Sequence, residues 1–200
     1  MNFILSFWGL LVNYVDFWEV WREVVELDIE VIDILKEINR EGYETPLRLV
    51  AKIISKKINV SNIILEKKFV DKVYAIMKPK RCSIEFISWL RGFGKFGVLS
   101  NTQCKCFIKD FFTHVGIHPD VLVTSDSIIL RKPRRSVFRY ILKRIKAEPY
   151  NTIYIGDSFE DLGAMGVGMF TVIVGESGGH MNFSDLCEAW RWLRESLTKD

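Results

Sequence analysis

The hydrophobic positions in the first 80 residues follow two different spacings. Residues 3–12 begin as an unbroken apolar run that turns at Gly9, which is typical of a buried β-strand. Four further segments mix apolar and charged residues at roughly helical spacing, with no convincing strand between them: 17–27, 31–41, 47–57 and 63–77. This pattern predicts a block of amphipathic helices inserted after a single strand.

From residue 83 onward, strand and helix patterns alternate. Short apolar runs predict strands at 96–99, 121–123, 153–155 and 171–174. The segments around them have helical spacing, which predicts helices at 84–91, 105–115 and 136–146. A last helix is expected from a Ser184 cap to residue 196. Such alternation favours parallel βαβ units. We therefore expect an α/β fold with a doubly wound parallel sheet, in a core domain of residues 1–12 and 81–200, and an α-helical cap domain of residues 13–80.

Composition and charge narrow the partners and the compartment. The chain has 200 residues, is 48% hydrophobic and carries a net charge of +3, so we expect one good core and neither a nucleic-acid nor a membrane partner. The apolar first fifteen residues lack a basic leading segment and a small-residue cleavage site, and charges follow from Asp16 on, which favours a cytoplasmic protein. The four cysteines show no disulfide-framework spacing, and we interpret them as reduced thiols.

Two carboxylates follow the expected strand 153–155. The strand ends at Gly156, and Asp157 and Asp161 come directly after it. Because ligands in open α/β sheets bind beyond the carboxyl ends of the strands, this pair could hold a hard cation such as Mg²⁺. The alternative is that the acids, with Ser158, cap the next helix. The local motif alone favours neither interpretation.

Three motifs in a fixed order carry a family resemblance: Ser100-Asn101 after a strand, Lys132-Pro133 before a helix, and Gly156-Asp157-Ser158 with Asp161 after a strand. This order resembles the haloacid dehalogenase superfamily, in its phosphatase and dehalogenase branch with a helical cap. The resemblance covers essentially the whole chain. It implies that Ser100 and the Asn101 amide bind a phosphoryl oxygen, that Lys132 pairs with negative charge, and that Asp157 and Asp161 hold or orient Mg²⁺.

The first motif of that family, Asp-x-Asp-Gly, is altered here. An alignment without gaps on Gly9 and Leu11 puts Ser6 at the nucleophilic aspartate and Trp8 at the second aspartate. By resemblance, the first carboxylate attacks the substrate and the second protonates the leaving oxygen. A tryptophan cannot exchange that proton, and Ser6 has no evident base. We therefore expect a hydrolase of weak or no activity, with weakened Mg²⁺ binding.

Three functions stay open at this stage. The chain could be a non-catalytic module that binds a small phosphorylated molecule or phosphate, with a protein partner also open. It could be a working Mg²⁺-dependent phosphohydrolase with an altered nucleophile, for which Asp16 is a candidate. It could also be purely structural, with Trp8 closing the site. The role of Lys132 also stays open, because its side chain could bind a ligand or simply neutralise Asp157 or Asp161.

Overall fold

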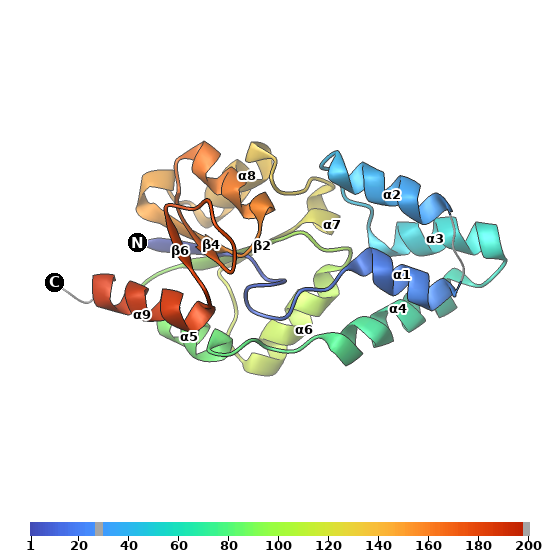
Figure 1. Cartoon of the computed structure of the whole chain (residues 1–200), viewed down its shortest axis with the longest axis horizontal. Helices are drawn as coiled ribbons and strands as arrows, with labels where there is room; N and C mark the ends of the chain where they lie inside the picture. Colours follow the sequence, from blue (N-terminus) through green and yellow to red (C-terminus); the bar gives the residue numbers. More distant parts are fainter. Residues whose placement is uncertain (27–29, 198–200) are drawn as a thin grey trace.

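The computed structural model describes residues 1–26 and 30–197. Its core is a parallel six-stranded sheet in the order β3-β2-β1-β4-β5-β6 (Figure 1). The strands are β1 (Asn2–Leu5), β2 (Phe96–Ser100), β3 (Val121–Thr124), β4 (Thr152–Gly156), β5 (Phe170–Val174) and β6 (Met181–Phe183). The expected parallel α/β sheet is confirmed, and the short edge strand β6 is added to it.

Helices cover both faces of the sheet. In β1, Phe3 and Leu5 pack into one hydrophobic cluster and Ile4 into the other, because successive side chains of a strand point to opposite faces. The first face carries α5 (Ser83–Leu90), α6 (Lys105–Val115) and α9 (Leu186–Leu197), and the second carries α8 (Arg135–Ile145) and the 3₁₀ helix η2 (Phe159–Val167). Burial on both faces explains why three successive residues of β1, Phe3, Ile4 and Leu5, are apolar.

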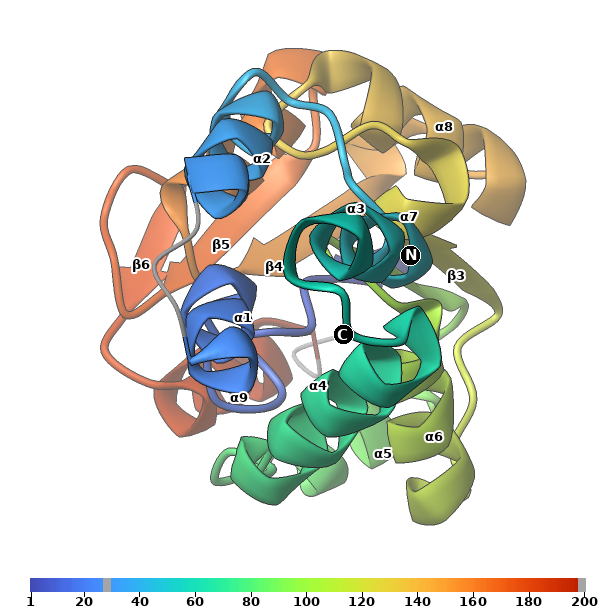
Figure 2. The ribbon, with the colours of Figure 1, turned by 90° about the vertical axis from the view of Figure 1, so that its right-hand side faces the viewer.

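In the part of the chain that the structure describes, four helices form the insert between β1 and α5. They are α1 (Phe17–Val25), α2 (Glu30–Arg40), α3 (Leu47–Ile58) and α4 (Asn62–Ile76), and they lie together beyond the carboxyl edge of the sheet (Figures 1 and 2). The helical insert expected from the sequence is confirmed, although the expected end of the first helix at residue 27 lies outside the described residues. The domain boundaries at residues 12 and 81 stay predictions. None of the described helices is both long and apolar enough to cross a membrane.

Buried polar contacts hold this insert on the core. The indole Nε1 of Trp21 in α1 donates to Oε1 of Gln103 at 2.8 Å. The Glu44 carboxylate, between α2 and α3, accepts hydrogen bonds from Ser125 Oγ at 2.5 Å and from Arg131. Glu44 is only 3% exposed. Because unpaired buried polar groups are costly, these pairs favour one seating of the insert over the sheet.

The cysteine prediction is wrong in this structure, because all four cysteines are paired. Cys82 bonds to Cys187 across a Cα–Cα distance of 5.5 Å, and Cys104 bonds to Cys106. Cys82 directly precedes α5 and Cys187 lies in α9, and these two helices pack side by side on one face of the sheet. Spacing along the chain gives no sign of this contact between residues 105 positions apart.

Candidate active site

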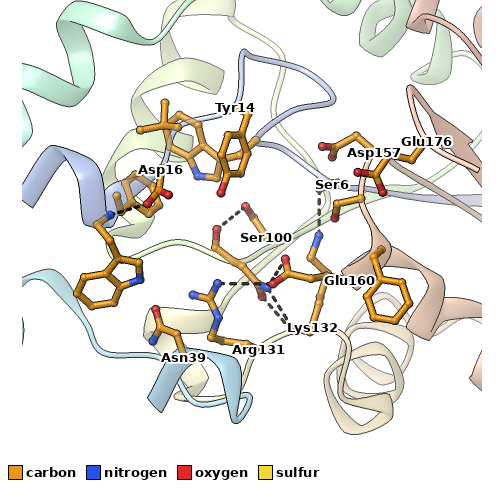
Figure 3. Close-up of a pocket in the computed structure, with 17 residues that line it drawn as sticks. Ser6, Tyr14, Asp16, Asn39, Ser100, Arg131, Lys132, Asp157, Glu160 and Glu176 are labelled. Carbon is orange, nitrogen blue, oxygen red and sulfur yellow. Dashed lines mark hydrogen bonds and ion pairs between the residues drawn. The ribbon is translucent and has the colours of Figure 1, made fainter. Parts of the chain in front are cut away.

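The strand order gathers the candidate residues at one edge of the sheet. The chain runs from β1 outward to β2 and β3 and then returns to the other side of β1 for β4, which creates a crevice at the carboxyl ends of the strands. Ser6 follows β1, Ser100 ends β2, and Asp157 follows β4. A cavity of about 510 Å³ opens there, and its wall includes these expected site residues (Figure 3): Ser6, Trp8, Ser100, Asn101, Lys132 and Asp157.

Lys132 makes a buried ion pair with Asp161 behind the cavity wall. Its Nζ lies 2.5 Å from Asp161 Oδ1, 3.0 Å from Ser6 Oγ and 3.3 Å from Tyr154 Oη. The lysine side chain is 3% exposed and the aspartate is fully buried. Since an ammonium has only donors, Ser6 accepts a hydrogen bond from Lys132. Lys132 therefore does not serve as a base for the Ser6 hydroxyl.

Every oxygen of Asp161 is already engaged. Oδ1 accepts from Lys132 and from Tyr154 Oη at 2.5 Å, and Oδ2 accepts from Asp157 N at 2.9 Å and from the amide and hydroxyl of Ser158 at 3.2 and 3.1 Å. Burial by itself opposes ionisation of Asp161, but the Lys132 ammonium and the hydrogen bonds outweigh it and lower the pKa. With Ser158, Asp161 forms the capping box of η2, which is the helix-capping role that the sequence left open.

Asp157 is the carboxylate that faces the cavity. Its Oδ1 is buried and has no hydrogen-bond partner among the described residues. The carboxylate rests on Gly9, whose φ is +81° and where an added Cβ would lie 1.8 Å from Asp157 Oδ2, so this close approach requires glycine. Burial and then the charge of Asp161 raise the pKa of Asp157 to about 7, with Lys132 and Lys80 acting in the opposite direction.

This raised pKa predicts a pH-dependent effect of Asp157→Asn on stability. The unfolded chain loses the proton near the ordinary pKa of 3.8, whereas the folded protein keeps it until about pH 7. The folded state binds more protons in that window, so the contribution of Asp157 to stability falls as pH rises through it. In a chelator, Asp157→Asn should stabilise the protein on the order of 2 kcal/mol at pH 8, after allowing for partial exposure, and by less than half of that at pH 5, because pH 5 lies early in this window. Urea unfolding at both pH values measures this difference. The exposed Asp71→Asn is the control, and equal effects of Asp157→Asn at the two pH values would contradict the expectation.

The donors suit only a weak Mg²⁺ site. The unpartnered Oδ1 of Asp157 fits a cation ligand, and the nearby Ser6 hydroxyl lines the same cavity. However, the oxygens of Asp161 are taken, and no group of three or more His, Cys, Asp or Glu suited to a metal occurs in the described residues. Hard cations prefer several oxygen ligands with negative charge, and this cavity offers one free carboxylate at its deep end.

Ser100 and Asn101 differ in how free their side chains are. Asn101 Oδ1 accepts from Lys132 N at 2.9 Å, and its Nδ2 donates to Lys132 O at 3.2 Å and to Glu160 Oε2 at 3.0 Å. These bonds fix two loops to each other. Among the described residues, the buried Ser100 hydroxyl has only a long contact of 3.5 Å to Asn101 O, so it is the better placed of the two side chains to donate to a ligand.

Trp8 forms a wall of the cavity and leaves its volume open. Its ring meets Phe7 and Phe17 edge-on, with centroid distances of 5.1 and 5.2 Å, so it joins the core to the first helix of the insert. The side chain is 7% exposed. Its Nε1 is buried and has no hydrogen-bond partner among the described residues.

Sequence reasoning missed several residues of the site. Tyr154 lies in the predicted strand 153–155 and is not among the expected site residues, yet its hydroxyl binds Asp161. A tyrosine in a buried strand needs a partner for that hydroxyl, which was the available signal. Tyr14, Asn39 and Glu176 also line the cavity, and they come from segments whose position over the sheet is set by tertiary packing.

Comparison with known proteins identifies the family. The family model for haloacid dehalogenase-like hydrolases matches residues 11–166, so the chain belongs to the haloacid dehalogenase-like hydrolase family. The matched segment begins after Ser6 and Trp8, so this comparison leaves the expected alteration of the first motif as a prediction.

The individual proteins that this chain matches are only distantly related to it. The chain is 33% identical over 105 residues to a glyceraldehyde 3-phosphate phosphatase of Methanocaldococcus jannaschii, covering 49% of this chain and 45% of the relative. It is 30% identical over 107 residues to the enzyme of that name from Methanothermobacter thermautotrophicus, covering 50% and 46%. The chain thus spans about half the length of the curated relatives it matches. The HAD-hydrolase YfnB of Bacillus subtilis, solved bound to magnesium, has a similar fold with a TM-score of 0.70, 17% identity and coverage of 96% and 98%.

Proposed function

We propose that this protein binds a small phosphorylated molecule at its family's hydrolase site and hydrolyses it weakly or not at all. The observation that carries the proposal is the position of Ser6 and Trp8. Ser6 directly follows β1 and lines the cavity with Trp8, Ser100, Lys132 and Asp157. The side chains that suit phosphoryl binding are therefore gathered, whereas the two carboxylates of the first motif are replaced.

The chemistry of Ser6 and Trp8 supports weak or absent turnover. Ser6 accepts a hydrogen bond from Lys132, whose ammonium is paired with Asp161. An indole N–H at position 8 cannot act as the general acid and base, and loss of such help typically costs about 10²–10⁴ in rate. The weak donor set for Mg²⁺ adds to this loss, because the metal supplies charge stabilisation in phosphoryl transfer.

The names of the curated relatives indicate the kind of ligand. Glyceraldehyde 3-phosphate is a small phosphate monoester, and the matched segments place this chain near phosphatases of that name. A cavity of about 510 Å³ has the size range of small-molecule sites. We therefore propose a small phosphate monoester as the ligand class, with Mg²⁺ as a weakly held companion near Asp157.

A second candidate is a working Mg²⁺-dependent phosphohydrolase with an altered nucleophile. Asp16 favours it, because this carboxylate lines the cavity. Against it, Asp16 Oδ1 already accepts from the amides of Trp18 and Glu19 at 2.9 and 3.4 Å as the N-cap of α1. Phosphate release that is lost in Asp16→Asn, which keeps the cap, would favour this candidate over the first.

Binding of inorganic phosphate tests the first candidate. We expect phosphate to bind by titration calorimetry, with and without Mg²⁺, and Ser100→Ala to weaken binding about tenfold or more, because hydrogen bonds to charged groups contribute about 1.5–3 kcal/mol. The exposed Ser136→Ala is the matched control. Absence of phosphate binding in both conditions, or equal binding by Ser100→Ala and the unmodified protein, would contradict the proposal.

A further inference from the structure

The side chains of the cavity change in character with depth. The deep end is formed by Ser6, Ser100 and Lys132, which are 3%, 2% and 4% exposed. The Ser6 and Ser100 hydroxyls can donate to a ligand there, whereas the Lys132 ammonium is held by Asp161, and Asp157 adds a carboxylate at the same end. At the outer end the aromatic side chains Tyr14 and Phe159 are 70% and 72% exposed, and acidic residues lie among them.

The lining carries more negative than positive charge. Among the residues that the structure describes, the lining has the acidic residues Asp16, Asp157, Glu160 and Glu176 against the basic residues Arg131 and Lys132. Both basic residues are already paired: Arg131 binds Glu44 and lies 3.8 Å from Glu160, and Lys132 binds Asp161. The pairing leaves an excess of carboxylates facing the outer cavity, which attracts a cation.

Two of these carboxylates, Asp16 and Glu160, lie near Tyr14. Figure 3 shows Asp16, Glu160 and the Tyr14 hydroxyl turned toward the same space. The electrostatics agree, because partial burial and then the charges of Asp16 and Glu160 raise the pKa of Tyr14, with the Arg131 cation acting in the opposite direction. Trp18 and Phe159 line the same cavity. Aromatic faces beside carboxylates attract ammonium and quaternary ammonium groups.

An independent observation indicates that a ligand with an acceptor reaches Trp8. The Trp8 side chain lines the cavity and is 7% exposed, yet its Nε1 donor is unpartnered within the described residues. A buried donor without an acceptor is costly. An oxygen of a bound ester would supply that acceptor.

We propose that the ligand is a zwitterionic phosphoester, a phosphate monoester whose far end carries an ammonium or quaternary ammonium group. The phosphate end rests on the proposed function and lies against Ser6, Ser100 and Trp8. The cationic end lies among Tyr14, Glu160 and the other outer residues. A phosphoester with a neutral tail leaves Asp16 and Glu176 without an ion-pair partner among the described residues, and Glu160 with only Arg131 at 3.8 Å.

Two isosteric compounds test the cationic end. Phosphocholine and 3,3-dimethylbutyl phosphate have the same shape, but a carbon replaces the charged nitrogen in the second. We expect the protein to bind phosphocholine about tenfold more tightly in titration calorimetry, as cation–π contacts and partly screened ion pairs supply together. The preference should shrink as salt is added. Inorganic phosphate and choline are titrated alongside.

Variants assign the two ends of the ligand. Glu160→Gln with Glu176→Gln should abolish the preference for phosphocholine and leave binding of the neutral isostere unchanged, whereas Glu195→Gln on the exposed face of α9 should change neither. Trp8→Phe should weaken both phosphoesters alike. Trp190→Phe is its control, because Trp190 Nε1 in α9 is also buried and unpartnered in the described part of the chain.

The outcomes separate this inference from the proposed function. Equal binding of the two isosteres overturns the zwitterionic ligand and leaves phosphate binding intact. A preference that survives Glu160→Gln with Glu176→Gln overturns the assignment of the cationic end. If neither the phosphoesters nor inorganic phosphate bind, both proposals fail, even where choline alone binds.

Discussion

Replacing Lys132 by methionine should destabilise the folded protein by about 3–5 kcal/mol, because it leaves the carboxylate of a broken buried ion pair without its counter-charge. Asp161 is fully buried and Lys132 is its ion-pair partner at 2.5 Å. Methionine fills a similar volume, so the loss is mainly electrostatic. Tyr154 and the amides of Asp157 and Ser158 still donate to Asp161, which limits the cost to this range. Urea unfolding at neutral pH measures it.

A second variant separates the charge from the packing. Lys132→Met combined with Asp161→Asn should be less destabilised than the sum of the single changes, since the combined variant leaves no unpaired charge at either position. Lys143→Met, on the exposed side of α8, is the matched control and should stay within about 0.5 kcal/mol. A loss of that small size for Lys132→Met would show that the buried pair is not what holds these loops together.

Much of the fold could be predicted because its signals are local. The apolar run at β1 and the helical spacing of residues 17–77 each identify one element, and their order along the chain implies a parallel sheet with a helical insert. The strand β6 could not be predicted, because it has only three residues, all partly or fully exposed, and so shows no clear alternation of hydrophobic and polar positions. The disulfide between Cys82 and Cys187 could not be predicted either, because α5 and α9 meet only through tertiary packing.

The candidate site could be predicted as a set of residues but not as a set of contacts. The motifs place Ser6, Ser100 and Asp157 at neighbouring strand ends, and the cavity does lie there. Which acid pairs with Lys132 depends on the turn of η2, where the Ser158 cap directs Asp161 inward and leaves Asp157 facing the cavity. That choice needs three-dimensional geometry, as does the excess of carboxylates supplied by Asp16 and Glu176 from distant loops.

Placing aspartates at the two positions that we align with the family's first motif, with Ser6→Asp and Trp8→Asp together, should raise Mg²⁺-dependent phosphate release from small phosphoesters by about 10²-fold or more, because general acid–base help alone contributes about that much. A carboxylate at position 6 meets a ready counter-charge, since Lys132 Nζ lies 3.0 Å from Ser6 Oγ, and it adds a second anionic ligand beside Asp157. The measurement is phosphate release with and without Mg²⁺.

The double substitution removes the Trp8 ring, and the resulting loss of folding stability must be measured separately. This ring packs edge-on against Phe17 and Phe107, and truncating a large buried aromatic typically costs about 3–5 kcal/mol. A thermal melt of the reverted protein therefore accompanies each assay, and Ser6→Asp alone serves as a variant that keeps the aromatic packing. Adding Asp157→Asn to the reverted protein should remove the gained activity. If the unmodified protein already releases phosphate as fast as the folded, reverted protein, the altered first motif is not what limits this site, and Asp16 becomes the nucleophile to test.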